Sequence, residues 1–194
     1  MYRFLYAMAC SAIVMACGKT ATSPVTPPSP PAGNTIYQNL NDSSLFYNQS
    51  IVIDLNKDGI ADFRFSNVLI QENNAFYLQF KVKPLNSNKL LTVTVDEPFV
   101  ACMNANETIG ITPLTPYEWT VSASALVIKN AGSIWEGPWK NRTDSYLPVQ
   151  LEKNGALYSG WIRISSSNLY PARIIVHDAA VSTVAGTGIT AGSK

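Results

Sequence analysis

The sequence predicts an all-β domain, an antiparallel β-sandwich with jelly-roll-like connections. No stretch of ten or more residues places apolar side chains at helical spacing, whereas several segments alternate apolar and polar residues at every second position. Those segments are rich in Val, Ile, Thr and aromatic residues, which favour strands. Turn-forming Asn, Gly and Pro separate the segments, and short strands between such turns are typical of sandwiches.

Residues 1–16 have the pattern of an export signal. Arg3 precedes an apolar run that ends near Val14, which is long enough for a signal but shorter than the roughly 20 residues that span a bilayer. The sequence VMAC, which ends at Cys17, resembles the bacterial lipobox. That resemblance implies that Cys17 is lipidated and becomes the mature N-terminus. Cys10, in AMAC, is an alternative site, and a plain secretory signal cleaved nearby is another.

Residues 17–34 predict an extended tether, because five prolines lie among small polar residues. Such a segment favours polyproline II at about 3.1 Å per residue, so the stretch from Lys19 to Gly33 can hold a folded domain about 45 Å from a membrane. Residues 35–194 remain, which is a suitable size for one domain with its own core.

The predicted strands follow the tether in order. IVIDL, from residue 51 to 55, is rich in β-branched residues, and Phe63 and Phe65 alternate with a polar residue in the next segment. The segment after it predicts one apolar face, formed by Phe76, Leu78, Phe80 and Val82. Leu91, Val93 and Val95 alternate with threonines in a further strand. We expect these two strands to be neighbours in a meander.

The clearest hairpin lies near the C-terminus. Asn154 and Gly155 separate two alternating segments, and this pair favours a type I′ turn because both positions need a positive φ. RIIVHDAAV, from residue 173 to 181, predicts a closing strand.

One loop has the pattern of a calcium site. In DLNKDGIAD, residues 54–62, side-chain oxygens recur at alternate positions and Gly59 allows a sharp turn. Calcium takes about six to eight oxygen ligands, so the loop predicts that it binds this ion. The expected ligands are the side chains of Asp54, Asn56, Asp58 and Asp62 and the carbonyl oxygen of Ile60.

Predicted strands on both sides give this loop its resemblance to the calcium sites of FG-GAP repeats and thrombospondin type 3 repeats. An EF-hand or dockerin would need an acid at the twelfth position, which is Phe65. We therefore expect weak binding, with a Kd of about 10⁻⁴ to 10⁻³ M, unless Asp96 or Glu97 completes the coordination. The alternative is a solvated acidic turn without a metal.

The charge balance does not suggest a nucleic-acid partner. Removal of the signal takes away Arg3 and leaves 13 basic and 13 acidic side chains, with no basic run. After lipidation of Cys17 the single unmodified thiol is Cys102, in an apolar setting that predicts a buried and inert side chain.

Two tryptophans, Trp135 and Trp139, lie in a segment of Gly, Pro, Asn and charged residues. Exposed indole rings there would stack on sugars, and Arg142 would bind hydroxyl groups. The favoured alternative is that the rings lie in the core. Trp119 and Trp161 are expected to be packing residues.

Catalytic motifs are few. His177, the only histidine, lies beside Asp178, but no G-x-S-x-G supplies a nucleophile, so we interpret His177 as a strand residue. An acidic pair could instead be formed by two of Glu97, Glu107, Glu118 and Glu136.

GWIRI and IIVHDAAVST, together with the calcium loop and the lipobox, resemble exported lipoproteins of Bacteroidetes-type bacteria. This resemblance and the anchor imply the cell envelope, most simply the outer membrane. We expect a non-catalytic, calcium-stabilised lipoprotein that binds a glycan or an envelope protein. The alternative is a glycan-active hydrolase with an acidic pair near Trp135.

Overall fold

The computed structural model describes residues 33–72, 74–93, 99–130 and 135–194, and these residues contain strands and no helix. The all-β prediction is confirmed. The strands are β1 (Thr35–Leu45), β2 (Ser50–Ile53), β3 (Phe63–Glu72), β4 (Ala75–Pro84), β5 (Lys89–Val93), β6 (Thr108–Ile109), β7 (Tyr117–Thr120), β8 (Ser124–Lys129), β9 (Trp135–Glu136), β10 (Ser145–Lys153), β11 (Ala156–Ser167), β12 (Arg173–Ser182) and β13 (Ile189–Thr190).

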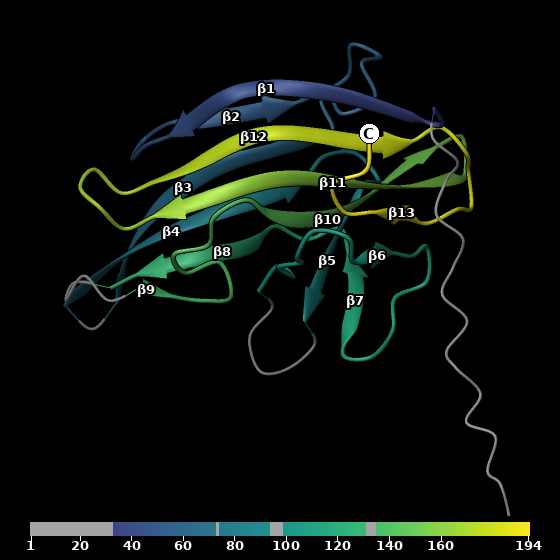
Figure 1. Ribbon diagram of the computed structural model, residues 1–194. Helices are drawn as coiled ribbons and strands as arrows, with labels where there is room; N and C mark the ends of the chain where they lie inside the picture. The colour runs from purple at the N-terminus through teal and green to yellow at the C-terminus, as the bar shows by residue number, and fades with distance from the viewer. Residues whose placement is uncertain (1–32, 73, 94–98, 131–134) are drawn as a thin grey trace, which may run out of the picture.

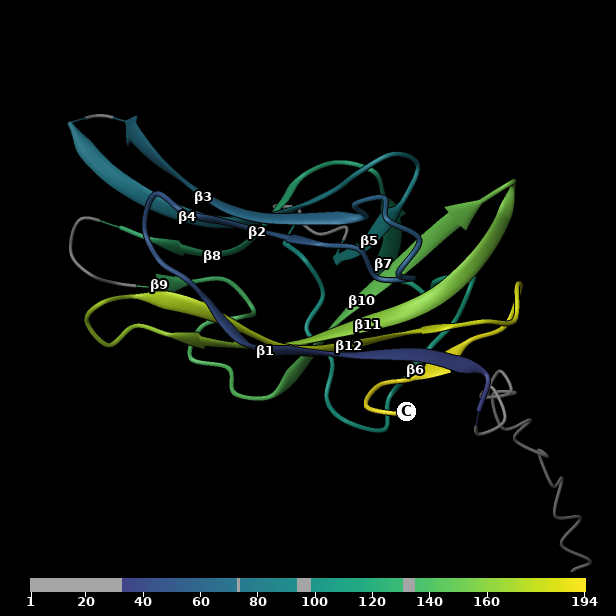
Figure 2. The same cartoon turned by 90° about the horizontal axis from the view of Figure 1, so that it is seen from above.

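Two main sheets form the sandwich. The six-stranded sheet has the order β1-β12-β11-β10-β5-β7, and the five-stranded sheet has the order β2-β3-β4-β8-β9. Neighbouring strands in both sheets are antiparallel. Figure 1 shows β1, β12, β11 and β10 side by side, and Figure 2 shows this layer facing the layer of β2, β3, β4 and β8.

The main core lies between the two sheets. Phe65 and Phe80 come from the five-stranded sheet, and Val149, Ile162 and Val176 come from the six-stranded sheet. All five are fully buried, and each contributes roughly 1.5 to 3 kcal/mol of hydrophobic stabilisation. The alternation of apolar and polar residues along a strand therefore indicates which side of that strand faces this core.

A smaller core lies on the outer side of the six-stranded sheet. The short pair β6 and β13 covers Trp161 and Ala180, and it contributes Ile109 and Ile189 to the contact. Tyr146 meets Trp161 edge to face, with ring centroids 5.2 Å apart. This end of the outer face is therefore covered, and Trp161 is a packing residue as the sequence predicts.

The C-terminal hairpin forms as predicted. Asn154 and Gly155 have φ values of 54° and 77°, and they join β10 to β11 in register from Lys153–Ala156 to Ser145–Ile164. The predicted strand at residues 173–181 is β12, which lies inside the sheet between β11 and β1.

The predicted meander is wrong. β4 pairs with β3 and β8, whereas β5 pairs with β10 and β7 in the other sheet. The chain crosses between the sheets at residues 85–88, where Leu85 N–H donates a 2.8 Å hydrogen bond to the carbonyl oxygen of Asp62. Alternation identifies the core face of a strand but does not say which sheet contains it.

Candidate metal site in the loop between β2 and β3

The loop at residues 54–62 connects two paired strands, as the sequence predicts. β2 ends at Ile53 and β3 begins at Phe63, and these two residues are register partners. Asp62 N–H donates a 2.8 Å hydrogen bond to the carbonyl oxygen of Ile53, which closes the base of the loop. The loop follows the arrow of β2 in Figure 1.

Side-chain oxygens organise the interior of the loop. The Asp54 carboxylate accepts hydrogen bonds from Asp58 N–H at 3.1 Å and from Gly59 N–H at 2.7 Å. Asn56 Oδ1 also accepts from Asp58 N–H, at 3.0 Å, and Asp58 Oδ1 accepts from Ile60 N–H at 3.0 Å. Gly59 has a φ of 87°, the left-handed conformation that the sequence predicts at the bend.

Asp62 is the buried acid of the loop, with 5% of its surface exposed. Its carboxylate accepts hydrogen bonds from Leu55 N–H at 2.7 Å and from Asn88 Nδ2 at 2.8 Å. Burial raises the pKa of Asp62 above its usual value, and the negative charges of Asp54 and Asp58 add to this shift. The two hydrogen bonds oppose the shift but do not cancel it.

Two residues distant in sequence hold the loop in place. Asn88, in the crossing between β4 and β5, donates to Asp62 and accepts a 3.0 Å hydrogen bond from Glu152 N–H. Lys153 Nζ lies 3.1 Å from Asp58 Oδ2, and this contact lowers the pKa of Asp58. Neither contact is predictable from the sequence, because the three segments meet only in the fold.

The donor chemistry fits a hard cation. The loop offers carboxylate, amide and carbonyl oxygens, with no sulfur or imidazole, and such ligands suit calcium. Within the described ranges, no three His, Cys, Asp or Glu side chains are gathered as a metal cluster. The acids instead accept backbone hydrogen bonds, and each carboxylate oxygen has further lone pairs that a cation could use.

A hollow of about 310 Å³ lies beside the loop. It is rich in amide and charged side chains, and a second hollow of about 300 Å³ shares Asn56 and Lys153 with it and adds the ring of Tyr158. The polar lining of the first hollow consists of Asn56, Asp58, Asp62, Asn86, Asn88, Glu152, Lys153 and Asn154.

The ligand-binding interpretation of Trp135 and Trp139 is wrong. Their exposed fractions are 2% and 0%, so neither indole presents a face to a sugar. Trp135 stacks on Phe80 with ring centroids 5.9 Å apart, and Trp139 Nε1 donates a 3.1 Å hydrogen bond to the Val100 carbonyl oxygen. The alternative of core packing is confirmed, because both side chains belong to the main core between the sheets. Arg142 is exposed, but its Nε bonds the carbonyl oxygen of Pro138 at 3.1 Å.

Several predicted residues lie outside the described ranges, namely Cys10, Cys17, Asp96 and Glu97. Glu107, Glu118 and Glu136 are all exposed, and the last two belong to different sheets. Cys102 is half-buried, and burial raises the pKa of its thiol, which disfavours the reactive thiolate.

The described residues include no helix long and apolar enough to cross a membrane.

Comparison with known proteins gave no match to any family model, curated protein or solved structure.

Proposed function

We propose that this chain is a calcium-stabilised binding module, anchored by lipid to the cell envelope and held away from the membrane by its proline-rich segment. The observation that carries the proposal is the loop at residues 54–62, where Asp54, Asn56 and Asp58 alternate beside the buried carboxylate of Asp62, whose ionisation the fold opposes. A divalent cation would remove that opposition, because it favours the ionised acid and neutralises its neighbours.

An ion in this loop would stabilise more than the loop itself. The loop joins two strands of the five-stranded sheet, and Asn88 and Lys153 connect it to the start of β5 and the end of β10 in the other sheet. Fixing these acids therefore strengthens the contact between the sheets. When free calcium is about 100 times Kd, binding to the native state alone adds about 2.7 kcal/mol to the free energy of unfolding.

The hollows beside the loop are the better candidate for ligand binding than the tryptophan segment. Asn56, Asn86, Asn88 and Asn154 provide both amide donors and carbonyl acceptors, which match the paired hydroxyl groups of a glycan or the peptide groups of an envelope protein. The hydrolase alternative has less support, because Trp135, near which its acidic pair was expected, lies in the core.

Thermal unfolding tests the calcium assignment. The full chain in detergent, melted in 10 mM CaCl₂ and then in excess EDTA, should show a midpoint about 5 to 10 °C higher with calcium, if Kd is about 10⁻⁴ M. Asp54→Asn should reduce this difference strongly. Glu72→Gln, which removes an exposed acid at the end of β3, should leave it unchanged. Equal midpoints for the wild type in calcium and EDTA would overturn the assignment.

A further inference from the structure

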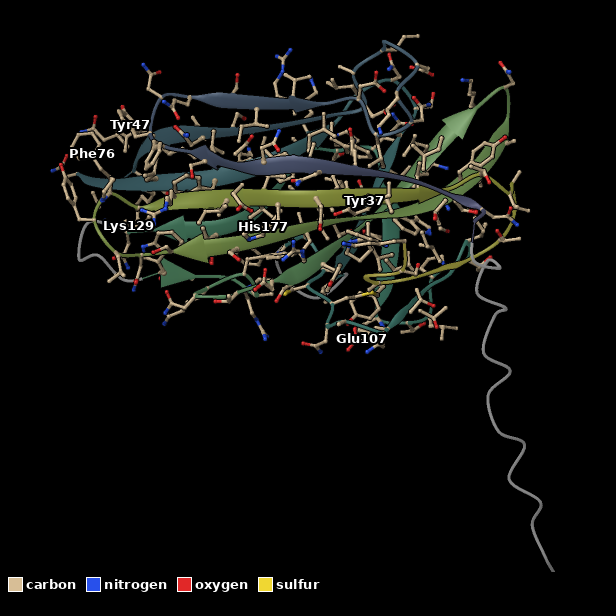
Figure 3. All side chains as sticks on the ribbon, turned by 45° about the horizontal axis from the view of Figure 1, so that its top comes forward. Tyr37, Tyr47, Phe76, Glu107, Lys129 and His177 are labelled. Carbon is tan, nitrogen blue, oxygen red and sulfur yellow. The ribbon has the colours of Figure 1, made fainter. Side chains whose placement is uncertain are left out.

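A second polar cluster lies on the outer face of the six-stranded sheet, apart from the loop. His177, on β12, makes two hydrogen bonds through its ring. Its Nε2 lies 2.7 Å from Ser165 Oγ on β11, and its Nδ1 lies 2.5 Å from Asp42 Oδ1 on β1. The three strands are neighbours in the sheet order β1-β12-β11. Figure 3 labels His177, with Tyr37 further along this face.

The backbone is irregular on both sides of His177. In the pairing of β11 with β12, the register passes from Arg163–Asp178 to Ile164–Val176, so no residue of β11 lies opposite His177. His177 also has no register partner on β1, because the pairing between β1 and β12 passes from Asn39–Asp178 to Ser43–Val176. Two bulges therefore meet at one residue, and bulges redirect side chains.

The bulges place both His177 and Asp178 on the outer face. Val176 and Ala179, on either side of them, face the main core. Asn41 and Asp42, in the bulge of β1, have φ values of 56° and 51°, which directs the Asp42 carboxylate to the ring of His177. Asn and Asp adopt the left-handed conformation more readily than other non-glycine residues, so the sequence of β1 suits this bulge.

The two hydrogen bonds are satisfied by the tautomer that carries its proton on Nδ1. Nδ1–H then donates to Asp42, and Nε2 accepts from the hydroxyl of Ser165. This is the arrangement of nucleophile, general base and orienting acid that activates serine in acyl transfer. His177 is mostly shielded, with 14% of its side chain exposed, which favours a fixed ring.

Arg163 keeps the neighbouring acids engaged. Its guanidinium bonds the Asp178 carboxylate through Nε at 2.8 Å and Nη2 at 2.9 Å, and it also bonds Asp144. The Asp144 carboxylate is 3.6 Å from His177 Nε2, so it would compete for the ring if it were free. Asp42 has no arginine contact in the described residues and pairs with Nδ1.

We propose that Ser165 is a nucleophile for ester hydrolysis, with His177 as its general base and Asp42 as a positioning residue. Ser165 Oγ attacks the acyl carbon and its proton passes to His177 Nε2. The C–O bond to the alcohol then breaks, and the leaving oxygen takes that proton. Water attacks the acyl-serine by the same route, which releases the carboxylic acid and restores the hydroxyl.

The surroundings define the class of substrate. Asp144 N–H donates a 2.9 Å hydrogen bond to Ser165 Oγ, which leaves the hydroxyl proton free to point at His177 Nε2. Ser165 has 8% of its surface exposed, and the Asp42 side chain on the other side of the His177 ring is 75% exposed. The limited exposure of Ser165, with no oxyanion donor assigned, suits activated esters of short acids, such as aryl acetates. It does not suit amides, whose poor leaving group needs stronger stabilisation of the oxyanion.

Labelling with a rhodamine fluorophosphonate tests the proposal on the full chain in detergent. The probe forms a P–O bond with an activated serine and loses fluoride, and mass spectrometry of the digested protein identifies the modified residue. We expect an adduct on Ser165 and slow release of nitrophenol from p-nitrophenyl acetate. His177→Gln should slow labelling by about 100-fold or more, because general base catalysis typically contributes about 10² to 10⁴.

Ser167→Ala is the matched control, since it removes another serine of β11, and labelling should be unchanged. Asp42→Asn should slow labelling without lowering the melting temperature in proportion, and Asp42→Glu should restore part of the rate. A folded wild type that gives no Ser165 adduct would overturn the proposal. An adduct that forms at the same rate in His177→Gln would also overturn it. The wild-type result does not depend on whether any variant folds.

Discussion

The fold changes the protonation equilibrium of the Asp62 carboxyl group. Burial and the nearby acids raise the pKa of Asp62 in the folded chain, while hydrogen bonds from Leu55 N–H and Asn88 limit the shift. The folded state therefore binds this proton more tightly than the unfolded state does. Asp178 shows the opposite balance, because hydrogen bonds from Arg163 and Tyr37 outweigh its burial and lower its pKa.

The raised pKa predicts a pH dependence that calcium should abolish. The ionised form of Asp62 is disfavoured in the folded chain. In EDTA, the contribution of Asp62 to the free energy of unfolding should therefore fall as pH rises. The fall should begin at the ordinary aspartate pKa and end above the raised pKa of Asp62. In calcium this fall should disappear, since the ion favours the ionised form. Urea midpoints measured between about pH 4 and 7 would detect the difference.

Asp62→Asn is the variant that isolates this effect, because it keeps a polar side chain of the same size. Its urea midpoints in EDTA should lack the fall with pH that Asp62 produces, whereas Glu72→Gln, at an exposed acid at the far end of β3, should retain it. A wild type whose midpoint has the same pH dependence in EDTA and in calcium would contradict the prediction. That result would also remove the electrostatic reason for binding an ion here.

At the scale of single elements, the two glycines of the C-terminal hairpin have different roles. Gly155 is in the turn, where its φ of 77° favours glycine and an added Cβ would meet no atom within 4 Å. Gly160 is within β11, where an added Cβ would lie 2.8 Å from the Ala180 carbonyl oxygen and 3.2 Å from Val149 Cγ2. Gly160 therefore allows β11 to fit against β12 and the core.

We predict that Gly160→Ala destabilises the protein more than Gly155→Ala does. The first change crowds backbone and core atoms and should cost about 1 to 3 kcal/mol, with the higher end expected because the contact is with backbone. The second adds only conformational strain, about 1 kcal/mol. Urea unfolding of both variants in calcium gives the comparison, and equal losses would contradict the assigned role of Gly160.

Elements whose conformation depends on neighbouring residues could be predicted. Elements whose position depends on strands far away in the sequence could not. Asn154 and Gly155 determine their turn through their own φ preferences, so the hairpin was foreseen. The sheet that contains β5 depends on β10 and β7, which follow it in the chain, so the expected meander was wrong. Phe76 is on the predicted core side of β4 but is 50% exposed, because the hairpin extends beyond the sandwich (Figure 2).

The same distinction applies to the two sites. The oxygens of the loop are all within nine residues, and their alternation was visible in the sequence. Asn88 and Lys153 come from other elements and were missed as contacts of the loop. Ser165 and Asp42 are 12 and 135 positions from His177, and two bulges bring them together. No pattern in the sequence marks a bulge of this kind, so the sequence predicts only an ordinary strand residue at His177.

At the scale of the whole molecule, the ends of the described chain lie close together. Thr35 pairs with Ser182, and Lys194 Nζ is 4.4 Å from the ring centroid of Tyr37. Figure 2 shows the start of β1 and the C-terminus at one end of the sandwich, with the tip of the β3–β4 hairpin at the other. If residues 17–34 tether the domain to a membrane, this geometry directs the hairpin, with exposed Leu69 and Phe76, away from the anchor.

The proposed lipid anchor at Cys17 can be tested by removing the thiol. One acyl chain holds a protein to a bilayer only marginally, whereas the diacylglyceryl group of a lipoprotein adds about 0.8 kcal/mol for each buried CH₂ and makes attachment durable. Cys17→Ala should therefore move the protein from the membrane to the soluble fraction and abolish incorporation of radioactive palmitate. Cys10→Ala should retain both membrane attachment and label. Palmitate that remains in Cys17→Ala but is lost in Cys10→Ala would move the lipid to Cys10. Absence of label in the wild type would indicate a cleaved secretory signal, and the domain would then be released rather than held about 45 Å from the membrane.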